Sequence, residues 1–148
     1  MSESFPQLDL HLCLADATLG QGQLMTGGQA LQIVHVDSAQ IGLMNTTFEA
    51  MGQRLAGNAR CFFELDGSFV WTGETADNTW QIDGMLYDHS SRLQRLELRG
   101  CCPLHIWYQL ISYTDSPIER LVCYLQSCRQ FVPAGSLSLL WKASDERL

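Results

Sequence analysis

The chain has 148 residues and a formal net charge of −7, from 9 basic and 16 acidic side chains. A chain of this length forms one ordinary domain, residues 1–148, and buries a sufficient core without disulfides or metals. Its acidity disfavours nucleic acid and anionic membrane surfaces as partners, because both attract positive charge. It shows no secretory signal and no apolar run near the ~20 residues that cross a bilayer. We therefore expect a cytoplasmic protein with reduced cysteines.

The first part of the chain is expected to hold two strands and one helix. Leucines alternate with other residues over 8–14, which predicts a half-buried strand. The glycine-rich stretch 15–29 is expected to be a loop, and residues 30–36 a second strand. Apolar residues then recur at three- and four-residue spacing over 38–55, and Gly57 follows them. This pattern predicts a helix that is capped by Asp37 or Ser38.

An antiparallel meander is predicted from about Cys61 to Arg99. Its first hairpin turns at Asp66-Gly67. A two-residue turn would mix apolar side chains between the faces, whereas a three-residue turn over 65–67 sorts them by polarity. We therefore predict the three-residue, bulged turn, with glycine in the left-handed conformation. The face that this register makes apolar carries Cys61, Phe63, Phe69 and Trp71.

The second hairpin of the meander is predicted to join residues 79–83 to residues 95–99. Pairing Ile82 with Leu96 collects the apolar side chains on one face. The same register places Asp83 opposite Arg95, where the two side chains form an exposed ion pair of little energetic weight.

The last third of the sequence predicts mainly helix. Residues 103–113 fit both a helix and a strand, and proline at the first turn favours the helix. Ser116-Pro117-Ile118-Glu119 is typical of a capping box, which predicts a helix through Leu125. Residues 136–141 are expected to form a closing strand. The predicted fold is α+β, an antiparallel meander sheet of about seven strands with two or three helices packed mainly on one face.

The densest group of reactive side chains is Cys101, Cys102 and His105. Neighbouring thiols and an imidazole are the groups that a thiol enzyme uses as nucleophile and base. Their spacing is not that of a zinc site, and buried structural cysteines are the more common explanation. A small enzyme that uses thiol and histidine chemistry here is therefore the alternative hypothesis.

Other polar groups give no converging pattern. Asp9, His11 and Cys13 share one face of the first strand, but alternate strand residues are about 6.6 Å apart, too far to share a metal. His89 lies in a predicted loop with serines and an aspartate, which does not make a catalytic triad. We expect no metal and no cofactor, and a metal site that draws on His11, Cys13 or His89 is the third possibility.

The main hypothesis is a non-catalytic binding module that uses a face or an edge of the sheet. Helices on one side of the sheet would leave the other face to solvent or to a partner. Aromatic and apolar residues on that face are typical of interfaces. The expected partner is another protein, a small ligand or a second copy of this chain. The residues expected to bind it are Phe62, Val70, Met85, Tyr87 and Arg95.

Overall fold

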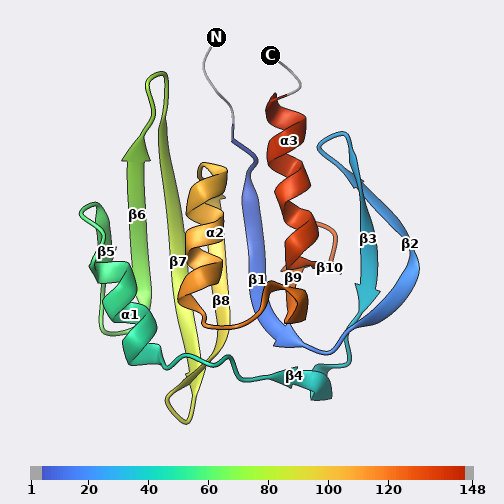
Figure 1. Ribbon diagram of the computed structural model, residues 1–148, viewed down its shortest axis with the longest axis horizontal. Coiled ribbons are helices and arrows are strands. Elements are labelled where there is room, and N and C mark those ends of the chain that lie inside the picture. Colours follow the sequence, from blue (N-terminus) through green and yellow to red (C-terminus); the bar gives the residue numbers. More distant parts are fainter. Residues whose placement is uncertain (1–4, 146–148) are drawn as a thin grey trace.

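Strand β1 lies in the middle of a ten-stranded antiparallel sheet in the computed structural model, which describes residues 5–145 (Figure 1). The strands are β1 (Leu8–Ala15), β2 (Thr18–Thr26), β3 (Gln29–His35), β4 (Ile41–Gly42), β5 (Cys61–Phe63), β6 (Ser68–Glu74), β7 (Thr79–His89), β8 (Arg92–Cys101), β9 (Leu121–Leu125) and β10 (Gln130–Pro133). The α-helices of the described residues are α1 (Phe48–Ala56), α2 (Leu104–Tyr113) and α3 (Leu139–Asp145). The predicted α+β class is therefore correct, although the sheet has ten strands where about seven were expected.

The order of strands across the sheet is β2-β3-β10-β9-β1-β8-β7-β6-β5, and the short β4 pairs with the end of β1. The predicted meander is present, because β5, β6, β7 and β8 are neighbours in chain order. Strand β1 inserts between β8 and β9 and joins the meander to the C-terminal strands. This long-range pairing joins all ten strands into one sheet.

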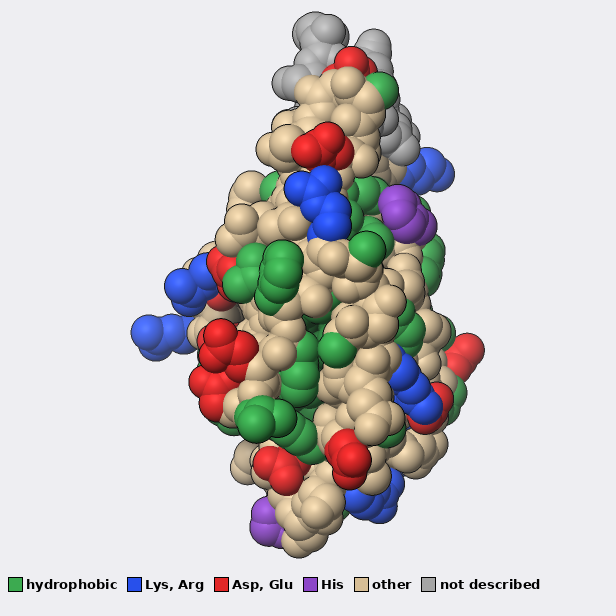
Figure 2. All heavy atoms as spheres, turned by 90° about the vertical axis from the view of Figure 1, so that its left-hand side faces the viewer, with side chains coloured by type: hydrophobic (Ala, Val, Ile, Leu, Met, Phe, Trp, Pro, Cys, Tyr) green, Lys and Arg blue, Asp and Glu red, His purple; other side chains and the backbone are tan. Residues whose placement is uncertain are grey.

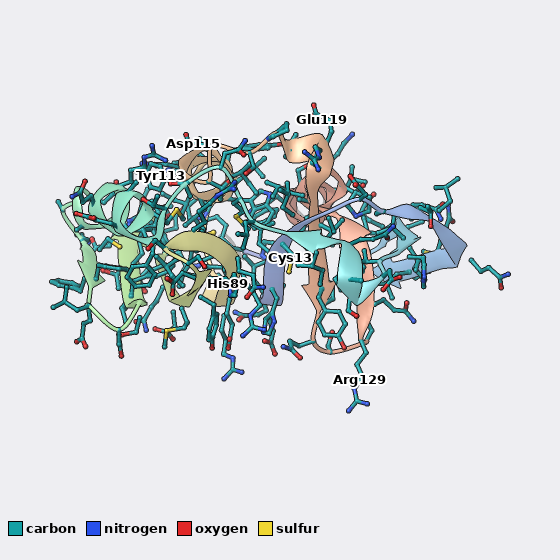
Figure 3. The ribbon with its side chains drawn as sticks, turned by 90° about the horizontal axis from the view of Figure 1, so that it is seen from below. Cys13, His89, Tyr113, Asp115, Glu119 and Arg129 are labelled. Atoms are coloured by element: carbon teal, nitrogen blue, oxygen red, sulfur yellow. The ribbon has the colours of Figure 1, made fainter. Side chains whose placement is uncertain are left out.

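All three helices lie on the same face of the sheet, and side chains project from the other face (Figures 1 and 3), where a small second cluster buries Cys13, Ala15, Val34 and Val122. The leucines of β1 point toward the helices, as the alternation in the sequence predicts. They pack in one core with Leu96 and Leu98 of β8 and with residues of α1 and α2. The largest fully buried side chains of these helices are Met51, Leu55, Trp107 and Leu110.

The first hairpin has the predicted turn. Cys61 pairs with Trp71 and Phe63 with Phe69, which leaves residues 65–67 as the turn. Gly67 has φ +98°, the left-handed conformation that favours glycine. The carboxylate of Asp66 accepts hydrogen bonds from the hydroxyl of Ser68 at 2.6 Å and from its backbone N–H at 2.9 Å. These bonds lower the pKa of Asp66 and stabilise the turn in its charged form.

The predicted register of the second hairpin is wrong by four residues. Asp83 lies opposite Arg99, and Arg95 lies opposite Tyr87. The strands run on to a tight turn at Ser90 and Ser91, which both have positive φ. A shift by an even number keeps every side chain on its predicted face, so polarity alone does not distinguish the two registers.

Two predictions in the N-terminal half are also wrong. Most of the expected loop at 15–29 is strand β2, which pairs with β3 through the two-residue turn Gly27-Gly28. The expected helix from residue 38 shortens to α1, because residues 41–42 pair with β1 instead. Asp37 does cap a turn, a single 3₁₀ turn over 38–40, while the side chain of Thr47 caps α1.

In the C-terminal third the predicted helix at 103–113 is confirmed as α2. The helix predicted from the capping box is wrong: Pro117 starts only one 3₁₀ turn, and Leu121–Leu125 form β9. This strand lies between β1 and β10, and its consecutive residues Leu121, Val122 and Cys123 are all buried, so its apolar run carries no period of two. The predicted closing strand at 136–141 is instead a 3₁₀ turn and the start of α3.

Candidate functional site

The face of the sheet opposite α1, α2 and α3, called the open face below, carries the candidate site. It presents alternate side chains of neighbouring strands, and three strands supply most of its charges. On these three strands the open face carries both charged and uncharged side chains. They are Asp9, His11 and Cys13 of β1, Arg95, Glu97 and Arg99 of β8, and Asp83, Met85 and Tyr87 of β7. In Figure 3 their side of the sheet lies below the ribbon, opposite the labelled Asp115 and Glu119.

The register of β1 against β8 arranges the charges of the open face in rows. Asp9 lies opposite Arg99, with 3.8 Å between Oδ1 and Nε, and Arg99 in turn lies opposite Asp83. This row alternates acid, base and acid across three strands. Since Arg99 and Asp9 are largely exposed, their attraction contributes little to stability and remains available to a partner.

His11 lies at the centre of the open face, between β8 and β9. Its Nε2 is 3.6 Å from Oε2 of Glu97 and 2.7 Å from the side-chain amide of Gln126. In the neutral ring with hydrogen on Nδ1, Nε2 accepts the amide hydrogen of Gln126. Burial lowers the pKa of His11, and Glu97 opposes this shift. The lowered pKa favours the neutral imidazole.

Arg95 and Tyr87 form the next row. The guanidinium of Arg95 lies 4.0 Å from the centre of the Tyr87 ring, within the range of a cation–π interaction. The Tyr87 hydroxyl donates a hydrogen bond of 2.9 Å to Oε2 of Glu97. The Nε atom of Arg95 is buried and has no hydrogen-bond partner among residues 5–145. This contact thus places the guanidinium of Arg95 over the Tyr87 ring.

The β5 end of the open face is apolar. Phe62 is 66% exposed and pairs with Val70 of β6. Met85 lies on the same face of the neighbouring strand β7, and Leu65, in the turn beside them, is 95% exposed. Figure 2 looks onto this edge of the molecule and shows hydrophobic patches between acidic side chains. An exposed aromatic ring beside charged groups is a common feature of protein interfaces.

Two hollows mark the open face. The larger, about 450 Å³, lies at one end of the strands and brings a guanidinium, a thiol, hydroxyls and amides together. Its lining includes Gln7, Arg60, Thr72, Gln81 and Cys101. The smaller, about 190 Å³, is lined by Asp83, Gly84, Met85, Glu97 and Arg99. Both hollows are shallow.

Cys101, Cys102 and His105 do not lie on one surface. Cys101 is half-buried and lines the larger hollow, whereas Cys102 is buried on the helix side of the sheet. Burial raises the pKa of Cys102 to about 12, with a further contribution from Cys101. His105 is exposed in the first turn of α2. A thiol with its pKa raised in this way is a poor nucleophile.

The other polar candidates lie apart from one another. His89 is the last residue of β7, and Cys13 is buried on the open face with its pKa raised to about 11 by burial. In residues 5–145 no group of three or more histidines, cysteines or acids is arranged to hold a metal ion. The pair of His11 with Glu97 was not predicted, because only the pairing of β1 with β8 brings the two residues together.

None of the helices in the described part of the chain is long and apolar enough to span a membrane. No family model matches the sequence, and comparisons with curated proteins and with solved structures found no significant match.

Proposed function

We propose that this protein is a non-catalytic binding module that holds a protein partner on the open face of its sheet. The observation that carries the proposal is the exposure of Phe62, an aromatic side chain that is 66% exposed. The three helices all cover the opposite face of the sheet and leave this side chain uncovered. The binding residues are those expected from the sequence, Phe62, Val70, Met85, Tyr87 and Arg95. The proposed compartment is the cytoplasm, where cysteines stay reduced, and this is supported by the six free cysteines of the chain.

The chemistry of these residues supports a protein partner. Aromatic, methionine and arginine side chains are enriched in interface cores, and such residues supply much of the binding energy. Arg95 is already ordered by stacking on Tyr87, so its rotamer freedom is not lost again on binding. Phe62 and Met85 supply apolar area next to it.

The charged row beside the apolar patch supports a specific orientation of that partner. Asp9, Arg99 and Asp83 alternate in sign across β1, β8 and β7. A partner with the complementary pattern aligns with this row, whereas a surface of one sign meets repulsion at every second position. The row therefore adds specificity and association rate more than affinity.

A photo-crosslinking experiment tests the proposal. The photoreactive residue p-benzoylphenylalanine replaces Phe62 in one variant and Tyr108 in a control variant, since Tyr108 is also exposed, at 45%, but lies on α2. We expect one discrete protein adduct at position 62 in extracts of the native host, and none at position 108. Met85→Asp in the first variant should remove the adduct, while Tyr108→Asp should leave it unchanged.

Three outcomes would contradict the binding module. They are no adduct at position 62, the same adducts at both positions, and an adduct that Met85→Asp does not weaken. Circular dichroism of each variant shows whether the substitution has unfolded the protein or has changed only its binding surface. An adduct of twice the chain mass identifies a second copy of this chain as the partner on the open face.

The alternative function, a small enzyme around Cys101, Cys102 and His105, keeps one supporting observation. Cys101 lines the hollow of about 450 Å³ together with Arg60. In this alternative Cys101 is the nucleophile, and Cys102 serves only in the core. Thiol reactivity tests it, as described in the Discussion.

A further inference from the structure

The hairpin of β2 and β3 carries no acidic, lysine or arginine side chains. Residues 17–36 contain no Asp, Glu, Lys or Arg, although charged residues make up 17% of the chain. This run of 20 residues is the longest uncharged stretch in the sequence. It covers the whole hairpin. Two acidic chains that approach each other therefore meet the least repulsion at this hairpin.

The outer edge of β2 is the end of the sheet. Strand β2 pairs with β3 on one side, and no described residue pairs with it on the other. Leu19 and Met25 on this strand are 81% and 69% exposed. Figure 1 shows β2 bowed outward, away from the helices. An unprotected edge strand is a template for pairing with another chain.

Two residues of β2 present their backbone groups to that edge. Thr26 and Gln29 flank the two-residue turn Gly27-Gly28 and form a hydrogen-bonded pair in a turn of this type. Because antiparallel pairs alternate, Leu24 bonds to β3, while the N–H and C=O groups of Gln23 and Met25 point outward. The free edge thus offers two donors and two acceptors over residues 23–25.

A bulge limits the segment. The register shifts between Leu19 and Gln23, and the side-chain amide of Gln32 donates to the carbonyl oxygens of Gly20 and Gly22 at 3.4 Å and 3.3 Å. The bend directs the first part of β2 away from the line of residues 23–26. Pairing is therefore confined to Gln23–Thr26, and Leu19 lies outside it.

The opposite edge of the sheet is protected in a different way. Strand β5 has three residues, and its flanks are charged by Arg60 and Glu64. A short strand between charged residues resists edge-to-edge pairing. Of the two ends of the sheet, only the β2 edge lacks this protection.

We infer that two copies of this chain pair antiparallel through their β2 edges, with the two-fold axis at Leu24. In this register Gln23 of each copy exchanges both backbone hydrogen bonds with Met25 of the other, four bonds in all, and the two Leu24 side chains meet. A two-fold axis makes the contact self-complementary and closed. A short contact of this kind forms a weak, reversible dimer, below the ~1,200 Å² of stable interfaces.

This surface goes beyond the proposed function, because β2 and β5 lie at opposite ends of the strand order. Loss of the dimer and loss of the open-face partner are therefore separate results. Substitutions at Met25 test only the first, and substitutions at Met85 test only the second.

Sedimentation velocity tests the dimer on the full chain, from about 5 µM to about 500 µM, the range of transient association. We expect the average mass to rise with concentration toward twice the chain mass. Met25→Glu places like charges beside each other across the two-fold axis and should weaken the dimer by about tenfold or more. Leu19→Glu adds the same charge at an even more exposed site outside the segment and should change the dimer affinity little.

Hydrogen exchange gives a second measurement at residue level. The amides of Gln23 and Met25 should exchange more slowly as concentration rises, while the amide of Leu24, already bonded to β3, should not change. A single monomeric mass over the whole range would overturn the inference. So would a dimer that Met25→Glu and Leu19→Glu weaken equally, or that neither weakens, because the contact then lies elsewhere. Circular dichroism confirms that both variants are folded.

Discussion

The indole Nε1 of Trp141 donates a hydrogen bond of 2.7 Å to the backbone carbonyl oxygen of Cys102. This bond joins the C-terminal helix α3 to the segment between β8 and α2, and both groups are buried. Trp141 also stacks on Trp107 of α2, with 6.2 Å between the ring centres. The backbone carbonyl of Cys102 thus connects α3 to the start of α2.

The two stacked tryptophans allow a matched test of that bond. Trp141→Phe leaves the carbonyl of Cys102 without its donor and should lower the free energy of unfolding by about 1–3 kcal/mol beyond the loss of ring area. Trp107→Phe is the control, because Nε1 of Trp107 is buried and has no partner within residues 5–145. Urea denaturation measures both. Equal losses would show that the hydrogen bond contributes nothing.

Gly100 is expected to tolerate no side chain. It has φ +124° at the end of β8, and an added Cβ would collide with the backbone carbonyl oxygen of Gln81. Gly100→Ala should therefore destabilise the fold by about 3 kcal/mol, from strain and displaced backbone. Gly135→Ala is the control, since its Cβ would meet nothing closer than 4.0 Å. A thermal midpoint that falls equally in both variants would disprove the role of this close approach.

His11 makes stability depend on pH in one direction. In the unfolded chain a histidine has a pKa of about 6.5, and burial lowers the pKa of His11 in the folded chain. Below pH ~6.5 the unfolded chain takes up a proton that the folded chain resists, so stability falls as pH falls toward the folded pKa. His11→Gln should flatten the change in unfolding free energy between about pH 7.5 and about pH 5.5. His105→Gln, at an exposed position of α2, controls for loss of a histidine. An unchanged slope in His11→Gln would exclude this role of His11.

The cysteines should differ sharply in reactivity. Burial raises the pKa of Cys13 and Cys61 to about 11 and that of Cys102 to about 12, and it raises the pKa of Cys123 as well. Iodoacetamide near neutral pH should modify the two half-buried thiols, Cys101 and Cys128, before these four. Mass spectrometry of tryptic peptides identifies the order.

The same experiment separates the two functions proposed. A rate at Cys101 that reaches its plateau below about pH 8, with Cys128 still slow, would support thiol chemistry in the larger hollow. Slow reaction of both thiols, rising together with pH, leaves the binding module as the explanation. Early modification of Cys102 would contradict its buried position.

Features that depend on neighbours in the chain were predictable. The turn at residues 65–67 follows from Asp66, Gly67 and the polarity of the two flanking strands, all within one hairpin. The leucine alternation of β1 and the proline before α2 are local in the same sense. The separation of the meander into a core face and an open face also follows, because side chains of a strand alternate whatever its partner is.

Features that depend on distant partners were decided only by the tertiary structure. The apolar residues over 118–125 fit a helix as well as a strand, and β9 is a strand because β1 and β10 lie on both sides of it. The four-residue shift between β7 and β8 left every side chain on its predicted face, so the sequence contained no evidence against the wrong register. Only the structure could choose the longer hairpin.

The candidate site shows the same division. Phe62, Val70, Met85, Tyr87 and Arg95 were expected on the uncovered face from alternation alone, and the structure places them on that face. The approach of His11 to Glu97 and the stacking of Arg95 on Tyr87 require a pairing register between strands. The sequence by itself therefore determined which side chains face outward, because alternation is a property of one strand. The tertiary structure decided which of them meet, because register is a property of two strands.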